Sequence, residues 1–117
     1  MKRNMDLVRE ILFCIEADAD FDSVNEKYGQ EVVIGHVELL LDAQLIIGKV
    51  YRDLNSASAS AYVQRLTWAG HEFLDNARND TVWNKVISKV GNTVATVSFD
   101  VLVELLKGGV LAAIQKV

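Results

Sequence analysis

The sequence has a single cysteine and no paired Cys/His spacing of the kind that holds zinc. Because Cys14 has no second cysteine to pair with, we expect a reducing environment and no disulfide, metal or redox role. Charged residues interrupt the apolar ones at the amino end, and no uncharged run is long enough to span a bilayer. These absences predict a cytoplasmic protein that neither carries a signal peptide nor binds a membrane.

Catalytic motifs are missing as well. The sequence has no G-x-S-x-G elbow, no phosphate-binding glycine loop and no H-E-x-x-H. His36 and His71 lack a Cys or His partner three or four residues away, which favours packing or capping over metal binding. Asp18, Asp20 and Asp22 are spaced as in a calcium loop, but its glycine and final Glu are absent, so a solvated acidic turn is favoured. We expect no enzyme activity, no cofactor and no metal.

The whole chain has a formal net charge of −4, and positive charge is scarce in its first half. Residues 1–54 hold six Lys and Arg against eleven Asp and Glu, whereas residues 55–117 hold six against five. A nucleic-acid binder concentrates positive charge on the surface that faces phosphates. The acidic first half therefore counts against DNA as a partner.

Amphipathic segments follow one another from the amino end. Asn4 is a suitable N-cap for a first helix with apolar residues at helical spacing. Ser23 and Glu26 form a capping-box pattern, which predicts a second helix that ends at Gly29. A third helix is predicted over residues 30–43, hydrophobic on more than one side and without a Lys or Arg.

Two runs rich in β-branched and aromatic residues, 45–52 and 61–66, flank a Ser/Ala-rich loop without Gly or Pro. They predict a two-stranded hairpin with a flexible tip. Thr67 is a suitable cap for the next helix. We expect that helix to bury four apolar residues, which are Trp68, Phe73, Leu74 and Ala77.

Two further helices are predicted, one capped by Asp80 or Thr81 and a last one capped by Ser98. The last helix is apolar on nearly every side, and Gly108 and Gly109 favour a kink or a close helix crossing within it. Such a helix must be covered by its own domain, by another copy of the chain or by a different protein. The residues expected at an interface between copies are Phe99, Leu102, Val103, Leu106 and Val110.

The order of helix, hairpin and helix within residues 33–70 is typical of a winged helix. We therefore predict a mostly α-helical α+β fold with a small β-hairpin. A winged helix-turn-helix domain is expected over residues 1–79, followed by a C-terminal helical extension over residues 80–117. This extension packs on the core or forms the interface of a homodimer.

Three strings of the sequence point to a family: the opening MKRNMDLVREIL, then IGHVELLLDAQLI, then LTWAGHEFLDNARNDTVWNKV. With them the chain resembles the small bacterial and phage proteins called domain of unknown function 2513. The resemblance covers most of the chain. It implies a winged-helix N-terminal region and a frequent location in prophages or other mobile elements, and it implies no catalytic residues.

The predicted winged helix also resembles bacterial repressors of the arsenic-repressor and multiple-antibiotic-resistance types. The positions that face bases or phosphates in such repressors correspond here to Ile34, Gly35, Glu38, Leu41 and Asp42. None of these side chains can donate a hydrogen bond to a phosphate, and the two acidic ones would repel it. The chemistry of the third helix therefore differs from that of a DNA-reading helix.

These observations favour a non-enzymatic regulatory or interaction protein that binds a protein partner through its acidic third helix and apolar surfaces. The residues expected to bind the partner are Glu31, Gly35, Glu38, Leu41 and Asp42.

A dimeric DNA-binding transcriptional regulator is the alternative. Its contacts would come from six cations, which are Lys49, Arg52 and Arg65 on the wing and Lys2, Arg3 and Arg9 on the first helix. A stacking platform for single-stranded nucleic acid made of Trp68 and Trp83 is less favoured than core packing of both, because that mode needs a basic groove around the aromatic rings.

Overall fold

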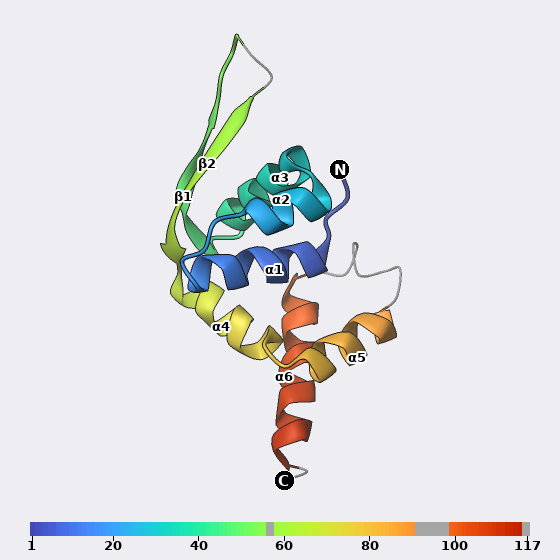
Figure 1. Cartoon of the computed structure of the whole chain (residues 1–117). Helices are drawn as coiled ribbons and strands as arrows, with labels where there is room; N and C mark the ends of the chain where they lie inside the picture. Colours follow the sequence, from blue (N-terminus) through green and yellow to red (C-terminus); the bar gives the residue numbers. More distant parts are fainter. Residues whose placement is uncertain (56–57, 91–98, 116–117) are drawn as a thin grey trace. The chain divides into compact units, whose positions relative to one another are not determined.

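The computed structural model describes residues 1–55, 58–90 and 99–115, with the backbone alone for residue 99 and residues 110–115. Within these ranges the chain forms six α-helices and one two-stranded antiparallel sheet (Figure 1). The predicted α+β class is therefore confirmed. The elements are α1 (Met5–Glu16), α2 (Asp22–Tyr28), α3 (Gln30–Asp42), β1 (Ile46–Arg52), β2 (Ala59–Leu66), α4 (Trp68–Ala77), α5 (Asp80–Val90) and α6 (Phe99–Gln115).

The chain divides into two compact units, Met1–His71 and Glu72–Val117, which we call the N-terminal and C-terminal units. The division falls inside α4, whereas we expected it after residue 79. None of the described helices combines the length and the apolar character needed to cross a membrane.

The helix starts follow the local capping chemistry, in part as predicted. Asn4 caps α1, because its side-chain oxygen accepts a hydrogen bond from the Leu7 N–H at 3.2 Å. The prediction of a capping box at the start of the second helix is wrong. Helix α2 begins at Asp22, one residue before Ser23, and no side chain caps it. Gly29 ends this helix as predicted, with a φ of +93° that L side chains rarely adopt.

Of the next two helices, α4 has the predicted cap, whereas the cap of α5 lies one residue before the predicted position. Thr67 caps α4, since its Oγ1 accepts a hydrogen bond from the Gly70 N–H at 3.1 Å. The cap of α5 is Asn79 rather than Asp80 or Thr81, because the Asn79 side-chain oxygen accepts from the Val82 N–H at 3.0 Å. The predicted cap of the last helix, Ser98, lies outside the described residues.

The hairpin pairs β1 with β2 from Ile46 opposite Leu66 to Arg52 opposite Ala59, with an irregularity between Ile47 and Gly48. A Cβ on Gly48 would lie 2.3 Å from the Tyr62 carbonyl oxygen, so only glycine fits at this bulge. Lys49 lies opposite Tyr62, and both side chains are exposed.

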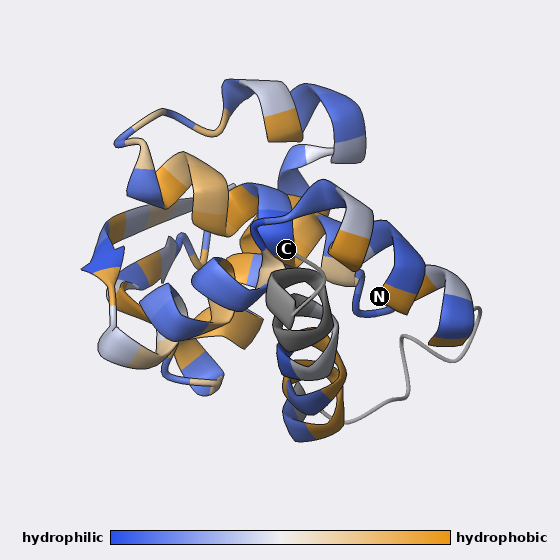
Figure 2. Cartoon of the chain, turned by 90° about the horizontal axis from the view of Figure 1, so that it is seen from below, coloured by the Kyte–Doolittle hydropathy of each residue, from blue (hydrophilic) through white to orange (hydrophobic). Residues whose placement is uncertain are grey.

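The core of the N-terminal unit lies where its helices and the hairpin meet. Figure 2 shows hydrophobic residues gathered where these elements face one another. Its buried apolar side chains come from α1, α2, α3 and the ends of the hairpin, and they include Leu7, Ile11, Leu12, Val24, Val33, Val37, Leu40, Ile46 and Leu66.

His36 is a buried polar side chain of this core, with no exposed surface. The Asn4 N–H donates to its Nε2 at 2.8 Å, so its Nδ1 carries the proton that is donated to the Val32 carbonyl oxygen, also at 2.8 Å. The predicted packing role is therefore confirmed for His36, whereas the His71 side chain is exposed.

In the C-terminal unit the Phe73 and Trp83 rings meet edge to face, with centroids 6.4 Å apart and planes at 87°. Trp83 is only 1% exposed, which confirms core packing for this tryptophan. A Cβ on Gly109 would lie 2.7 Å from the Val82 Cγ1, so α6 crosses α5 closely at that glycine.

Candidate interaction surface

A groove of about 510 Å³ opens on the N-terminal unit, between the end of α3, the start of β1 and the start of α4. We call it the Trp68 groove. Its lining is mostly apolar and contains no charged side chain, and it consists of Leu41, Gln44, Ile46, Ile47, Gly48, Thr67, Trp68 and Ala69.

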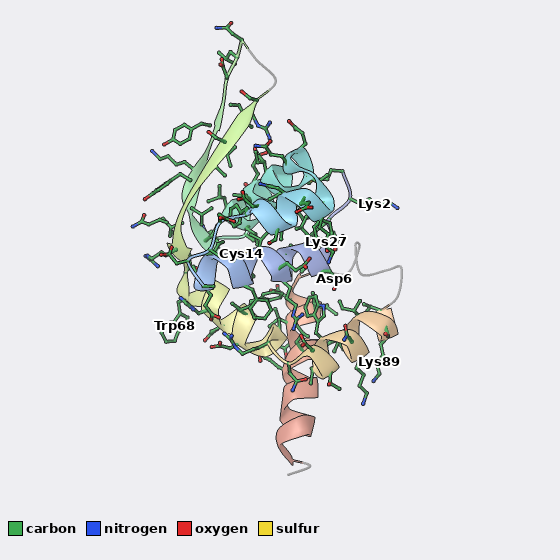
Figure 3. All side chains as sticks on the ribbon, viewed as in Figure 1. Lys2, Asp6, Cys14, Lys27, Trp68 and Lys89 are labelled. Atoms are coloured by element: carbon green, nitrogen blue, oxygen red, sulfur yellow. The ribbon has the colours of Figure 1, made fainter. Side chains whose placement is uncertain are left out.

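Trp68 is 80% exposed at the rim of this groove, and Figure 3 shows its side chain pointing away from the ribbon. The prediction that α4 buries this residue is wrong. Successive helical residues turn by about 100°, so Trp68 falls on the side of α4 opposite to the buried Phe73 and Leu74. Ile47, which lines the same groove, is 40% exposed.

The walls of the groove are held by hydrogen bonds to the main chain. Gln44 has a left-handed φ of +60°, and its carbonyl oxygen accepts from the Thr67 hydroxyl at 2.7 Å. The Thr67 N–H donates to the Leu45 carbonyl oxygen at 2.9 Å. A Cβ on Gly70 would lie 2.1 Å from that same oxygen, so the start of α4 approaches the α3–β1 connection closely. These contacts fix the backbone of the α3–β1 connection relative to the start of α4.

One side of α3 is acidic. Glu31, Glu38 and Asp42 are spaced so that they share a side of the helix, and we call them the acidic stripe. Glu31 and Asp42 are exposed, and Asp42 directly follows the groove residue Leu41. No basic residue lies in the last turn of α3, where the helix dipole is negative. One side of α3 therefore carries negative charge, although none of these three acids lines the groove.

An ion pair joins one acid of this stripe to the hairpin. The Arg52 guanidinium donates to the Glu38 carboxylate, and this hydrogen bond, together with the nearby negative charge, raises the pKa of Arg52. The pair couples a residue predicted to bind DNA with one predicted to bind protein. Because both side chains are about half exposed, water screens the pair and it adds little to stability.

Two further residues were predicted to bind a protein partner, and they lie in different surroundings. Leu41 is partly exposed and lines the groove. Gly35 lies under the amino end of the chain, since a Cβ there would be 2.6 Å from the Met1 Sδ. Ile34, which corresponds to a base-facing position of the repressors, is 5% exposed and belongs to the core.

The remaining cations predicted to contact DNA lie on the hairpin, on α1 and just before α1. Lys49 and Arg65 are exposed on the hairpin, and the Arg65 guanidinium donates to the Leu66 carbonyl oxygen at 3.0 Å. On α1, the Arg9 guanidinium lies 5.0 Å from the centre of the Phe13 ring. Lys2 is exposed and Arg3 is half-buried.

Two residues predicted at an interface between copies, Leu102 and Leu106, are 2% and 0% exposed within the chain itself. They are already covered, so an interface cannot use them without unfolding their surroundings. Val103 is half-buried. The side chains of Phe99 and Val110 lie outside the described residues.

Among the described residues, the titratable side chains away from the groove form no metal site. No group of three His, Cys, Asp or Glu side chains there could hold a metal ion. Burial raises the pKa of the Cys14 thiol, and the charges of Glu10 and Asp20 raise it further. A raised pKa keeps this thiol protonated and weakly nucleophilic.

Residues 2–97 match the family described as Hypothetical protein (DUF2513). The chain belongs to the DUF2513 family. A DUF2513 relative from Haemophilus influenzae, described as "Uncharacterized protein", is 37% identical over 107 residues, which cover 87% of this chain and 89% of the relative. No solved structure matches the chain. The groove and the acidic stripe both lie within the residues matched by the DUF2513 family.

Proposed function

We propose that this DUF2513 protein is a non-enzymatic, regulatory interaction protein that binds a protein partner through the Trp68 groove and the acidic stripe. The observation that carries the proposal is the exposed Trp68 at the rim of an apolar groove. Tryptophan is enriched among the residues that dominate binding energy at protein interfaces. An apolar groove bordered by charged residues is typical of a surface that another protein covers.

The proposal includes a finer description of the fold. Three helices, a hairpin and a further helix follow in the order of a winged helix, with α3 in the place of the recognition helix. In that frame the acidic stripe would face the phosphates and repel them, which supports a protein partner over duplex DNA. A phage or prophage origin belongs to the same proposal and rests on the family resemblance.

Capture of partners from a bacterial cell lysate tests this function. We expect Trp68→Ala to abolish capture of a partner that the wild-type chain retains. Leu54→Ala is the matched control, because Leu54 is an apolar residue of the hairpin region that is 100% exposed and does not line the groove. Capture that survives Trp68→Ala as well as it survives Leu54→Ala would contradict the proposal.

A dimeric DNA-binding regulator is the second candidate, and the exposed Lys49 and Arg65 favour it. It predicts duplex binding that weakens as salt rises and on replacing both residues with Ala. Fluorescence anisotropy with the protein's own promoter DNA would measure this. An absence of binding even at low salt would eliminate this candidate.

A further inference from the structure

One side of the β1–β2 hairpin carries exposed tyrosines and cations that do not line the groove. We propose that this surface binds a single-stranded nucleic acid, whose bases stack on the tyrosine rings and whose phosphates meet the cations beside them. The surface consists of Lys49, Tyr51, Tyr62, Gln64 and Arg65, and we call it the outer hairpin face. The inference goes beyond the proposed function and does not depend on it.

The side chains of the hairpin are sorted onto two sides by the alternation along each strand. Lys49 and Tyr51 are exposed, whereas Val50 between them is half-buried. The half-buried positions lie on the side of the helices α1 and α3, which contact the hairpin. Arg52 belongs to this inner side, because its guanidinium pairs with Glu38 of α3. The outer hairpin face therefore points away from the acidic stripe.

A β-bulge brings Arg65 onto the outer side. Opposite residues of an antiparallel pair share one side of the sheet, and here Lys49 lies opposite Tyr62 and Ile47 opposite Arg65. Strict alternation would place Tyr62 and Arg65 on opposite sides, because they are three residues apart. The bulge adds Gln64 between them, and Gln64 and Arg65 are consecutive exposed residues. Such a bulge re-aims a side chain, and here it joins a second cation to the tyrosines.

Two tyrosine rings of this face are accessible for stacking. Tyr51 is 57% exposed and Tyr62 is 61% exposed. Tyr51 lies opposite Ser60, which makes Tyr62 its diagonal neighbour, and such neighbours are about 7 Å apart. Successive bases of a single strand stack on aromatic rings arranged in this way. In a duplex the neighbouring base pairs cover the faces of each base, so the rings favour an unpaired strand.

The charge of the hairpin fits a polyanion. Neither strand contains an Asp or Glu, and the acid that follows β1, Asp53, accepts a hydrogen bond from the Asn55 N–H at 2.9 Å. Among the described residues, no carboxylate pairs with Lys49 or Arg65. Cations beside aromatic rings are the combination that binds single strands without sequence preference. An acidic peptide would satisfy the cations but has no flat base to cover the rings.

Fluorescence anisotropy with labelled strands of about ten nucleotides tests the inference on the full-length chain. The probes are oligodeoxythymidine, oligouridine, a DNA duplex of the same length and an oligoglutamate peptide. At low salt we expect at least one single strand to bind, and the duplex and the peptide to bind at least about tenfold more weakly. A preference between the two single strands supports the inference and identifies the ligand as DNA or RNA.

Substitutions on the outer hairpin face separate stacking from charge. Tyr62→Leu should weaken binding of the single strand at least about fivefold, whereas Tyr62→Phe keeps the ring and should stay within about twofold of the wild type. Lys49→Ala should weaken binding and reduce the dependence of log affinity on log salt by about 0.7, the slope expected for one phosphate contact on a single strand. Lys89→Ala is the matched control, because it removes the same charge at an exposed position of α5, and it should leave the affinity within about twofold.

Four outcomes would overturn the inference. These are an absence of single-strand binding at low salt, binding of the duplex or the peptide as tight as that of the single strand, equal affinities of Tyr62→Leu and Tyr62→Phe, and an effect of Lys89→Ala as large as that of Lys49→Ala. Equal binding of duplex and single strand would favour the dimeric DNA-binding regulator instead. Protein capture through Trp68 is a separate measurement, so the proposed function stands or fails independently of these outcomes.

Discussion

His36, on α3, links its helix to the start of α1 through one ring nitrogen, which accepts from the Asn4 N–H, while the other donates to the Val32 carbonyl oxygen one turn earlier in α3. Its side chain has no exposed surface, so water cannot replace either partner. We expect His36→Phe to lower the free energy of unfolding by about 1–3 kcal/mol, because the Asn4 N–H loses its acceptor. Urea denaturation measures this loss.

His71→Phe is the control for His36→Phe, since the His71 side chain is exposed. It should change the free energy of unfolding by less than about 0.5 kcal/mol. Equal losses in the two variants would show that the buried hydrogen bonds of His36 contribute nothing specific.

We expect the stability of the folded chain to depend on pH in the alkaline range because of Tyr28. Its hydroxyl donates to the Glu10 carboxylate at 2.6 Å, and burial, followed by this hydrogen bond, raises the pKa of Tyr28 above its usual value of 10.0. A raised pKa means that the protonated form stabilises the folded state. This contribution is fully present below pH 10 and is lost as pH rises through the pKa of folded Tyr28.

Tyr28→Phe isolates that contribution. At neutral pH the variant should be less stable than the wild type by about 1 kcal/mol, and the difference should shrink above about pH 10. The pKa of Lys27 is raised chiefly by its hydrogen bond to Glu10 and next by its interaction with Tyr28, so the comparison is repeated with Lys27→Met in both proteins. A stability difference that stays constant from pH 8 to pH 11 would contradict the assignment.

Single residues of the site were only partly predictable. The acidic character of α3 follows from the sequence itself, because residues that share a helix side can be read from their spacing. The exposure of Trp68 could have been read in the same way, since it lies opposite Phe73 on α4. The Arg52–Glu38 pair could not, because it depends on how the hairpin register carries Arg52 back to α3.

Among the elements, the connection from α3 through the hairpin to α4 depends on Thr67. Its hydroxyl accepts from the Gly70 N–H and donates to the Gln44 carbonyl, so one side chain caps α4 and fixes the groove wall. We expect Thr67→Val, which keeps the shape and removes the hydroxyl, to lower the free energy of unfolding by about 1–2 kcal/mol. Thermal or urea unfolding measures the change.

Thr81→Val provides the comparison, because Thr81 is exposed in the first turn of α5 and Asn79 supplies the cap there. It should be nearly neutral. If Thr67→Val were as stable as the wild type, the hydroxyl would have no part in holding the start of α4.

The helices and strands were predictable to within a few residues, because apolar periodicity depends on many positions at once. The third helix was expected over residues 30–43 and spans Gln30–Asp42. Caps were less predictable, as Ser23 and Asp80 show. A cap depends on the backbone conformation of one residue, and a neighbouring Asn or Asp can serve in place of the predicted one.

At the scale of the whole molecule, the acidic first half of the sequence becomes a unit with an acidic helix and an apolar groove on its surface. The second half carries a different apolar surface. On α6, Leu102 and Leu106 are buried, whereas Val101 and Leu105 are 51% and 40% exposed. The sequence showed that this helix is apolar on most sides, but it could not show which of those sides the chain itself covers.

From the exposed Val101 and Leu105 on α6 we predict how two copies of the chain would associate. Val101 and Leu105 are one helical turn apart on the same side, so two copies can cover them by packing α6 against α6. We expect the full chain to form dimers in sedimentation equilibrium. The double substitution Val101→Lys and Leu105→Lys should shift it to folded monomers whose melting temperature no longer depends on protein concentration. Leu102→Ala should instead lower the free energy of unfolding by about 2–4 kcal/mol, because it opens a cavity at a buried position. A wild-type chain that stays monomeric at every concentration measured would contradict an interface on α6 and would restrict the exposed apolar residues to contacts with other proteins.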